Sequence, residues 1–199
     1  GNFVEVPRLE FDHTGLPGFT EQMRRLDMTA GARLVSATTR PAGLEVRRAL
    51  GLKRGARVHE ITRIRSANTQ PVLLEETYLP AALFPGFLDA DLTGSLYARM
   101  ADEFGVPLVS ADEHIEATPA TATHSELLGV ATGDPLLLVS RTAYSRDGVA
   151  VEFCVPPALY ERESTNERFV LGKSPAMLRS LLREIGPRAP RRIVDIGVY

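Results

Sequence analysis

The chain has 199 residues, of which 23 are basic and 25 acidic, for a formal net charge of −2. This length suffices for one domain with its own hydrophobic core, and the charge balance excludes a general electrostatic attraction to nucleic acid. The single cysteine, Cys154, excludes an internal disulfide, and neither a signal peptide nor an apolar stretch of ~20 residues is present, so we expect a cytoplasmic, non-membrane domain with Cys154 as a buried structural thiol.

The first half of the chain shows one extended segment, two helical patterns and three strand patterns. Residues 1–17 have no helical period and are expected to be extended. Helices are predicted at 18–27, where Thr20 is the expected cap, and at 44–50, which ends at Gly51. The predicted strands are 32–41, 56–67 and 72–79, with a turn at 68–71 that joins the last two into a hairpin.

The second half of the chain continues with two helices and a strong hairpin. Helices are predicted at 95–104, starting at Ser95, and at 119–128, with Pro119 in the first turn and Gly129 after the end. The predicted strands are 108–117, 135–146 and 149–155, and the Asp147-Gly148 pair between the last two is typical of a type I′ turn. A strand at 168–171, a helix at 176–185 and a basic, loop-like tail at 187–192 complete the pattern.

These elements indicate the fold class. Successive hairpins with a few short helices favour a mostly antiparallel sheet flanked by helices, which is an α+β fold. No strand–helix–strand crossover of the length found in parallel sheets is evident.

Motifs of enzyme chemistry are absent from the sequence. It contains no nucleophile elbow, no phosphate-binding P-loop and no dinucleotide-binding glycine pattern, so no catalytic residues and no cofactor are predicted. None of the four histidines has a partner three or four residues away, and we interpret them as ordinary surface or sheet residues rather than metal ligands. They are His13, His59, His114 and His124.

Two arginines give the most informative pattern in the sequence. Arg63 and Arg65 are two residues apart in a predicted strand, so both side chains point to the same face. They indicate either a solvated sheet face or a clamp for an anion, because guanidinium groups suit phosphate and carboxylate oxygens. Thr20 and Ser95 each place a hydroxyl at a predicted helix start, which is typical of an anion site or of ordinary capping.

The partner strand contributes two carboxylates, Glu75 and Glu76. Side chains alternate along a strand, so one of the two must face the same side as the arginines. That residue forms either a cross-strand ion pair or an acceptor for ligand hydroxyls. The register decides which, and a directly opposed Arg65–Glu75 pair requires a turn with an odd residue count or a bulge.

Five stretches resemble, in order and spacing, the UTRA domain, which is the ligand-binding domain of the HutC branch of GntR-type bacterial transcription regulators. The resemblance covers residues 18–160 and is carried by 18–31, 61–68, 71–80, 94–97 and 128–144. Gly1-Asn2-Phe3-Val4 resembles the end of a winged helix-turn-helix domain. The resemblance therefore implies a linker at 1–17 from a missing DNA-binding domain, a UTRA domain at 18–171, and an extension of unknown role at 172–199.

The resemblance also implies a fold, a function and a site. The fold is similar to that of chorismate lyase, members are usually dimers, and DNA is contacted only through the missing domain. The effector is a small molecule, which in some members is a phosphorylated amino sugar and in others a histidine-pathway metabolite or a fatty acid. The chain is expected to be the sensor of a repressor and not an enzyme. The residues that match the family's ligand site are Phe19, Thr20, Arg63, Arg65 and Ser95 on the phosphate side and Glu75, Glu152 and Tyr160 on the sugar side.

One stretch departs from the family pattern. Where members have a compact Tyr-Arg-Gly-Asp-Arg-like run, residues 155–163 contain Pro156 and Pro157, so the preceding strand must end early or lie at an edge. The assignments of Glu152 and Tyr160 depend on this stretch. Two alternatives therefore stay open: an enzyme of the chorismate-lyase type that holds an anion with arginines, and a dimerisation module without a ligand.

Overall fold

The computed structural model describes residues 16–155, 170–171 and 194–198. The helices are α1 (Phe19–Arg25), α2 (Leu44–Ala49), α3 (Leu96–Phe104) and α4 (Ala122–Leu128), with a short 3-10 helix at Phe87–Asp89. The strands are β1 (Ala30–Pro41), β2 (Arg57–Ala67), β3 (Gln70–Pro80), β4 (Leu108–Pro119), β5 (Pro135–Ser145), β6 (Ala150–Val155), β7 (Val170–Leu171) and β8 (Val194–Val198).

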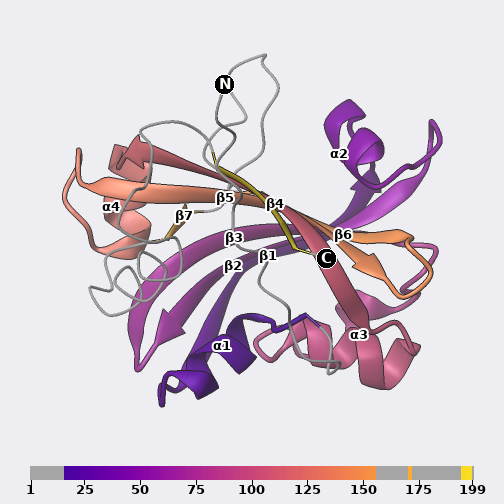
Figure 1. Cartoon of the computed structure of the whole chain (residues 1–199), viewed down its shortest axis with the longest axis horizontal. Coiled ribbons are helices and arrows are strands. Elements are labelled where there is room, and N and C mark those ends of the chain that lie inside the picture. The colour runs from indigo at the N-terminus through magenta and orange to yellow at the C-terminus, as the bar shows by residue number, and fades with distance from the viewer. Residues whose placement is uncertain (1–15, 156–169, 172–193, 199) are drawn as a thin grey trace, which may run out of the picture.

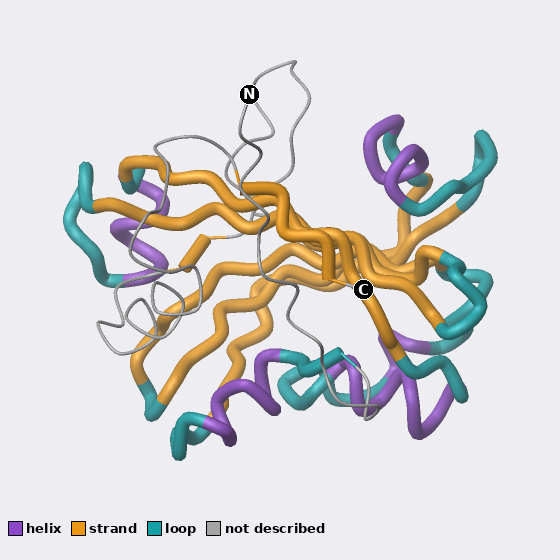
Figure 2. The backbone as a smooth tube through the Cα atoms, viewed as in Figure 1, coloured by secondary structure: helices purple, strands orange, loops and turns teal. Residues whose placement is uncertain are grey.

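The strands form one sheet in the order β1-β2-β3-β6-β5-β4-β8, and every described pair is antiparallel. Five of the described strands, β1 to β5, have 11 or 12 residues. The two-residue strand β7 lies between β3 and β5 and pairs with both. β6 pairs with the same two strands at other residues. Figure 2 shows this sheet in the centre with the helices at its periphery. The predicted α+β class with a mostly antiparallel sheet is confirmed.

Helices cover both faces of the sheet. α1 and α3 lie on one face, and α2 and α4 lie on the other (Figure 1). On the first face, Met100 of α3 packs with Ile61 and Leu79, while Met23 of α1 packs with Leu73. The alternate strand residues form the second face. There, Val46 of α2 packs with Val58 and Tyr78, and Leu128 of α4 packs with Ile64 and Leu138.

The neighbouring strands β2 and β3 are buried on both faces, and this sets the chemistry of the interior. Apart from Arg57 and the first two residues of β3, their residues are buried or half-buried. Charged residues on these strands therefore lie in the interior of the protein. Arg63, Arg65 and Glu75 lie on the face of α1 and α3, and Glu76 lies on the face of α2 and α4.

Two hairpin turns differ from the sequence interpretation. The first turn consists of Asn68 and Thr69 alone and not of residues 68–71, because β3 already begins at Gln70. Asn68 and Thr69 have left-handed φ angles of 48° and 72°, which are typical of a type I′ turn. At the Asp147-Gly148 pair only Gly148 is left-handed (φ 70°), and its N–H bonds to the Ser145 carbonyl. This hairpin uses a type I turn followed by a glycine bulge, so the prediction of a type I′ turn was wrong there.

Helix starts also differ at two places. Gly18, not Thr20, is the N-cap of α1, because the Thr20 hydroxyl accepts a hydrogen bond from Arg65 instead of capping the helix. Pro119 is the last residue of β4, and α4 begins only after Thr121, whose hydroxyl caps it. His124 of α4 is buried and completes this capping box, so it is neither a surface nor a sheet residue.

Other predictions have varied outcomes. β6 ends at Val155, directly before Pro156, as the two prolines predict. β8 was not predicted, because its short apolar pattern follows the tail without a turn signal.

The predicted helix at 176–185 and the tail at 187–192 lie outside the described residues, as does nearly all of the predicted linker. Within the described part of the chain, no helix has the length and apolarity needed to cross a bilayer.

A polar cluster lies on the face of α2 and α4, where Glu76 is almost fully buried. The Tyr78 hydroxyl donates a hydrogen bond to Glu76, and Arg40 pairs with Glu60 and donates to Tyr78 at 3.1 Å. Burial raises the pKa of Glu76 to about 7, the nearby Glu60 carboxyl adds to this shift, and Arg40 opposes it.

This cluster predicts a pH-dependent stability. Because the pKa of Glu76 is raised on folding, the folded state binds this proton more tightly than the unfolded state does. The resulting contribution to the free energy of unfolding is fully present below the unfolded pKa of 4.5 and is lost as the pH rises through about 7. Glu76→Gln keeps an acceptor for Tyr78 but cannot ionise. We expect it to be more stable than the parent by about 2–3 kcal/mol at pH 8.5 but not at pH 4, as measured by urea unfolding. The exposed Glu126→Gln should show no such divergence, and parallel curves for Glu76→Gln and the parent would contradict the assignment.

Candidate functional site

The register of the β2–β3 hairpin brings the two arginines and one carboxylate together. Arg63 of β2 lies directly opposite Glu75 of β3, and a bulge separates Arg65 from Ser66. Arg63 and Arg65 are each 3% exposed and Glu75 is 5% exposed, so the three charges are buried. We call Arg63, Arg65 and Glu75 the arginine cluster. The interpretation of Arg63 and Arg65 as a solvated sheet face was wrong, because α1 and α3 cover this face.

Three groups bind the terminal nitrogens of Arg63: two backbone carbonyls and the Glu75 carboxylate. One terminal nitrogen, Nη1, donates to the carbonyl oxygens of Leu92 at 2.8 Å and Gly94 at 2.9 Å, in the loop before α3. The other, Nη2, forms an ion pair with Glu75. Its Nε is buried and has no hydrogen-bond partner within the described part of the chain. A buried donor without a partner is costly, and a ligand acceptor at this point would relieve that cost.

Arg65 is held by α1 and by the edge strand β1. Its Nη2 donates to the Thr20 hydroxyl at 3.1 Å and its Nε to the Gly31 carbonyl at 3.2 Å. Its guanidinium lies 4.6 Å from the centre of the Phe19 ring, a cation–π contact. Burial lowers the pKa of Arg65 to about 10, although Glu75, 3.7 Å from its Nη1, opposes this shift, so Arg65 stays charged at neutral pH.

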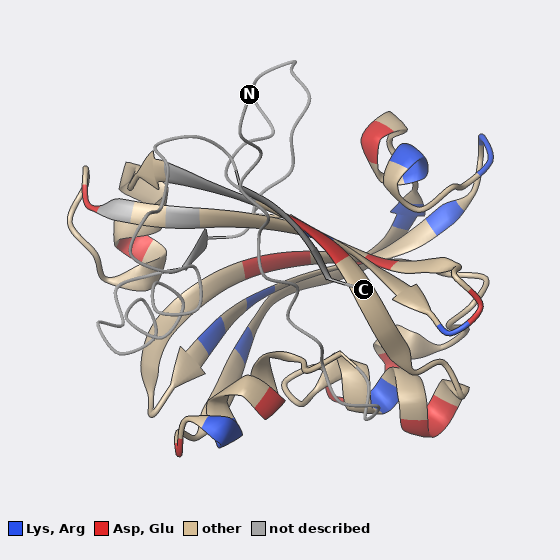
Figure 3. Ribbon diagram, viewed as in Figure 1, with Lys and Arg blue, Asp and Glu red and all other residues tan. Residues whose placement is uncertain are grey.

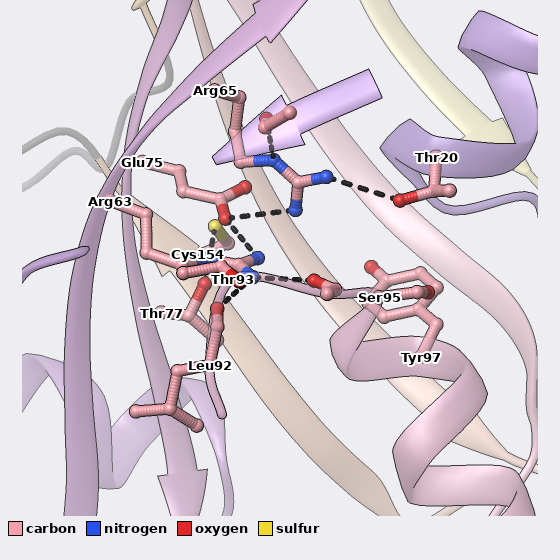
Figure 4. A network of polar contacts seen from close by, with 12 residues as sticks. Thr20, Arg63, Arg65, Glu75, Thr77, Leu92, Thr93, Ser95, Tyr97 and Cys154 are labelled. Atoms are coloured by element: carbon pink, nitrogen blue, oxygen red, sulfur yellow. Dashed lines mark hydrogen bonds and ion pairs between the residues drawn. The ribbon is translucent and has the colours of Figure 1, made fainter. Parts of the chain in front are cut away.

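Figure 4 shows Glu75 between the two arginines, with Thr20 on one side and the start of α3 below. The hydroxyl of Ser95 caps α3 by accepting from the Ala98 N–H at 3.2 Å. α3 therefore begins beside the carbonyl of Gly94 that accepts from Arg63. The predicted residues Thr20, Arg63, Arg65, Glu75 and Ser95 are gathered in this one region (Figure 4), and Phe19 joins them through its contact with Arg65.

A second polar group adjoins the arginine cluster. The Tyr97 hydroxyl donates to Glu152 at 2.5 Å and accepts from Arg141 Nη1 at 3.1 Å, and Arg141 forms an ion pair with Glu113. Burial raises the pKa of Glu152 to about 7, an effect that Arg141 opposes. Desolvation and the Glu152 carboxylate hold the pKa of Tyr97 well above its usual value, so Tyr97 remains a neutral donor.

Cys154 lies at the floor of this region beside Thr77, whose hydroxyl oxygen is 3.3 Å from the sulfur. The thiol is fully buried, and burial, followed by the nearby Glu152 and Glu75, raises its pKa well above the usual value. A protonated, buried thiol is a poor nucleophile, so the expectation of a structural cysteine is confirmed.

Sequence reasoning found part of this site. The structure brings Glu152 close to the arginine cluster, but Tyr160 lies outside the described residues. Tyr97, Arg141 and Glu113 were missed as site residues. For Tyr97 a signal existed, since it follows Ser95 by two residues at the start of a helix. Arg141 and Glu113 became visible only through the β4–β5 register, in which they are directly opposed.

The arrangement suits an anion with polar substituents. The arginine cluster has two positive charges and one negative charge, so it carries an excess positive charge in a buried setting. Elsewhere, basic and acidic residues are interspersed over the elements (Figure 3). Among residues 16–155, 170–171 and 194–198, no group of His, Cys, Asp and Glu side chains is suited to hold a metal ion.

Comparison with known proteins decides the family. A family model described as the UTRA domain matches residues 25–156, which is more than half of the chain. The chain belongs to the UTRA family. The crystal structure of the effector domain of PhnF from Mycobacterium smegmatis superposes on this UTRA chain with a TM-score of 0.68 at 27% identity, covering 79% of this chain and 90% of that one. The expected chorismate-lyase-like UTRA fold is thus confirmed.

Curated relatives agree with this assignment. The HTH-type transcriptional repressor NagR of Bacillus subtilis is 32% identical over 152 residues, which are 76% of this chain and 63% of NagR. The HTH-type transcriptional repressor PhnF of Mycolicibacterium smegmatis is 30% identical over 139 residues, 69% of this chain and 57% of PhnF. The UTRA chain thus spans less than two thirds of these relatives. Both are transcriptional repressors by name, which agrees with the prediction that this chain is part of a transcription regulator.

Proposed function

We propose that this UTRA chain is the sensor domain of a transcription repressor and that the arginine cluster binds the anionic group of a small effector. The observation that carries the proposal is the burial of two arginines that share one carboxylate. Such an arrangement is expensive to maintain for stability alone, because desolvation offsets most of the attraction between buried charges. A ligand anion beside Arg65 and the Arg63 Nε, which has no partner among the described residues, would complete the pairing.

The surrounding groups support a phosphorylated sugar as the effector. Thr20 and Ser95 supply hydroxyls beside the arginines, and Glu75, Glu152 and Tyr97 supply acceptors and a donor suited to sugar hydroxyls or an amine. Except for Tyr97, these residues match the ligand site of those family members that bind phosphorylated amino sugars. Tyr160, as predicted from the family pattern, would complete the sugar side.

The remaining parts of the proposal concern the whole protein. DNA would be contacted by a winged helix-turn-helix domain joined through residues 1–17, and the protein would act as a cytoplasmic homodimer. Effector binding would change the spacing of the two DNA-binding domains, to which operator half-sites are sensitive. The domain bounds proposed are 18–171 for the sensor and 172–199 for the extension.

A thermal-shift screen tests the proposal. At 100 times its dissociation constant, a ligand that binds only the folded state adds about 2.7 kcal/mol, or about 5–10 °C for a chain of this size. We expect such a shift with glucosamine 6-phosphate, reduced to near zero in Arg63→Ala and retained in the exposed-residue control Arg33→Ala. No shift with any sugar phosphate or small carboxylate, in a folded sample, would reject the proposal. Product formation from chorismate would favour the enzyme instead.

A further inference from the structure

The Tyr97 side chain connects two parts of the molecule. Its hydroxyl is fixed between Glu152 of β6 and Arg141 of β5, which lie 55 and 44 residues further along the chain. Arg141 is itself fixed by its ion pair with Glu113 of β4. The position of the Tyr97 hydroxyl therefore depends on side chains from three strands of the candidate site.

The ring of Tyr97 lies against the backbone of Gly18. A Cβ atom placed on Gly18 would be 3.0 Å from Cδ2 and 3.2 Å from Cγ of the Tyr97 ring, which is closer than ordinary van der Waals contact. Gly18 has φ −74° and ψ 172°, an extended conformation that any residue adopts. The glycine is therefore required here by space and not by backbone conformation.

Gly18 joins the incoming chain to the arginine cluster. Two residues earlier, the Leu16 N–H donates to the Leu108 carbonyl at 2.9 Å. Gly18 is the N-cap of α1, and the next two residues, Phe19 and Thr20, contact Arg65. One short segment thus contacts β4, the Tyr97 ring and the arginine cluster in succession.

We propose that Gly18 is a positioning residue for the effector site: its missing side chain lets the backbone of residues 16–18 support the Tyr97 ring, so that site occupancy and the position of this segment are coupled. The inference rests on the proposed function for its biological meaning. Coupling of this kind is reciprocal, so a change at Gly18 alters the site, and a ligand at the site alters residues 16–18. A signal from the effector would leave the domain along this segment.

Gly18→Ala tests the proposal, and Arg33→Ala, at an exposed residue of β1 outside the arginine cluster, is its control. The first readout needs no ligand: the side-chain carboxyl carbon of Glu152 is followed by NMR from about pH 5 to about pH 9. The groups that act on Glu152 are Arg141, Tyr97, Glu75 and Arg63. The Tyr97 hydrogen bond lowers the Glu152 pKa, so its loss in Gly18→Ala should raise that pKa above about 7. Tyr97→Phe, which keeps the ring, should shift it in the same direction, and Arg33→Ala should leave it unchanged.

The second readout uses glucosamine 6-phosphate as the probe. Calorimetric titration should give about tenfold weaker binding to Gly18→Ala, the effect of one lost hydrogen bond to a charged group, and unchanged binding to Arg33→Ala. An unchanged Glu152 titration in a folded Gly18→Ala protein would overturn the inference, whatever the ligand result. If the parent chain fails to bind the probe while Gly18→Ala still shifts the Glu152 titration, the ligand proposal fails and the positioning role stands.

Discussion

Replacing Glu75 by glutamine is expected to lower the free energy of unfolding by about 3–5 kcal/mol, the effect of removing one partner from a buried ion pair. Glu75 forms ion pairs with both Arg63 and Arg65, and all three side chains are buried. Glutamine fills the same volume but leaves two adjacent guanidinium charges without a carboxylate between them. Urea unfolding at neutral pH measures the change, and the exposed-residue control Glu126→Gln should lie within about 0.5 kcal/mol of the parent.

The same variant should respond strongly to anions. Inorganic phosphate can replace the missing carboxylate between the arginines, so it should recover part of the lost stability of Glu75→Gln and stabilise the parent less. A sodium chloride series at matched ionic strength separates this specific effect from general screening. If Glu75→Gln is as stable as the parent, or if phosphate stabilises both proteins equally, then the arginine cluster does not depend on an anion in the way described.

The second large effect is expected at Arg65. Arg65→Ala should weaken the binding of glucosamine 6-phosphate by about 2–4 kcal/mol, or about 30-fold to 1,000-fold, because a buried, hydrogen-bonded charge is removed. Arg65 stays charged at neutral pH, with a pKa lowered by burial to about 10. Thr20, Gly31 and the Phe19 ring fix its orientation, so little ordering is needed when a ligand binds. Calorimetric titration provides the measurement.

Two further variants define what Arg65 contributes. Arg65→Lys keeps the charge but loses the planar fork, so it should recover only part of the affinity. Arg33→Ala removes an exposed arginine from the neighbouring strand β1 and should bind as tightly as the parent. Equal loss in Arg33→Ala and Arg65→Ala would show that general positive charge, and not the arginine cluster, attracts the ligand.

The sequence predicted those features that depend on local pattern. Alternation along β2 placed Arg63 and Arg65 on one face, and the hydroxyl of Ser95 at the start of α3 was evident from its position after a glycine. The antiparallel sheet also followed from the hairpins. Each of these depends on residues that lie within a few positions of one another.

Features that depend on distant segments could not be predicted. The burial of the arginines results from α1 and α3, which lie 38–46 residues before and 31–41 residues after them in the chain. The contact between Tyr97 and Glu152 joins residues 55 positions apart. The burial of Glu76 similarly depends on the helices of the opposite face. Turn type at Gly148 was also missed, because Asp-Gly suits both a type I′ turn and a type I turn with a glycine bulge.

The most direct test of the central claim compares two ligands that differ only in the anion. Glucosamine 6-phosphate and glucosamine are titrated separately into the chain in a calorimeter at neutral pH. If the arginine cluster binds the anionic group of the effector, the phosphate ester should bind at least about 100-fold more tightly, since two buried guanidinium groups each add a charge-assisted hydrogen bond. Equal binding of the two compounds, or binding of glucosamine alone, would contradict the account.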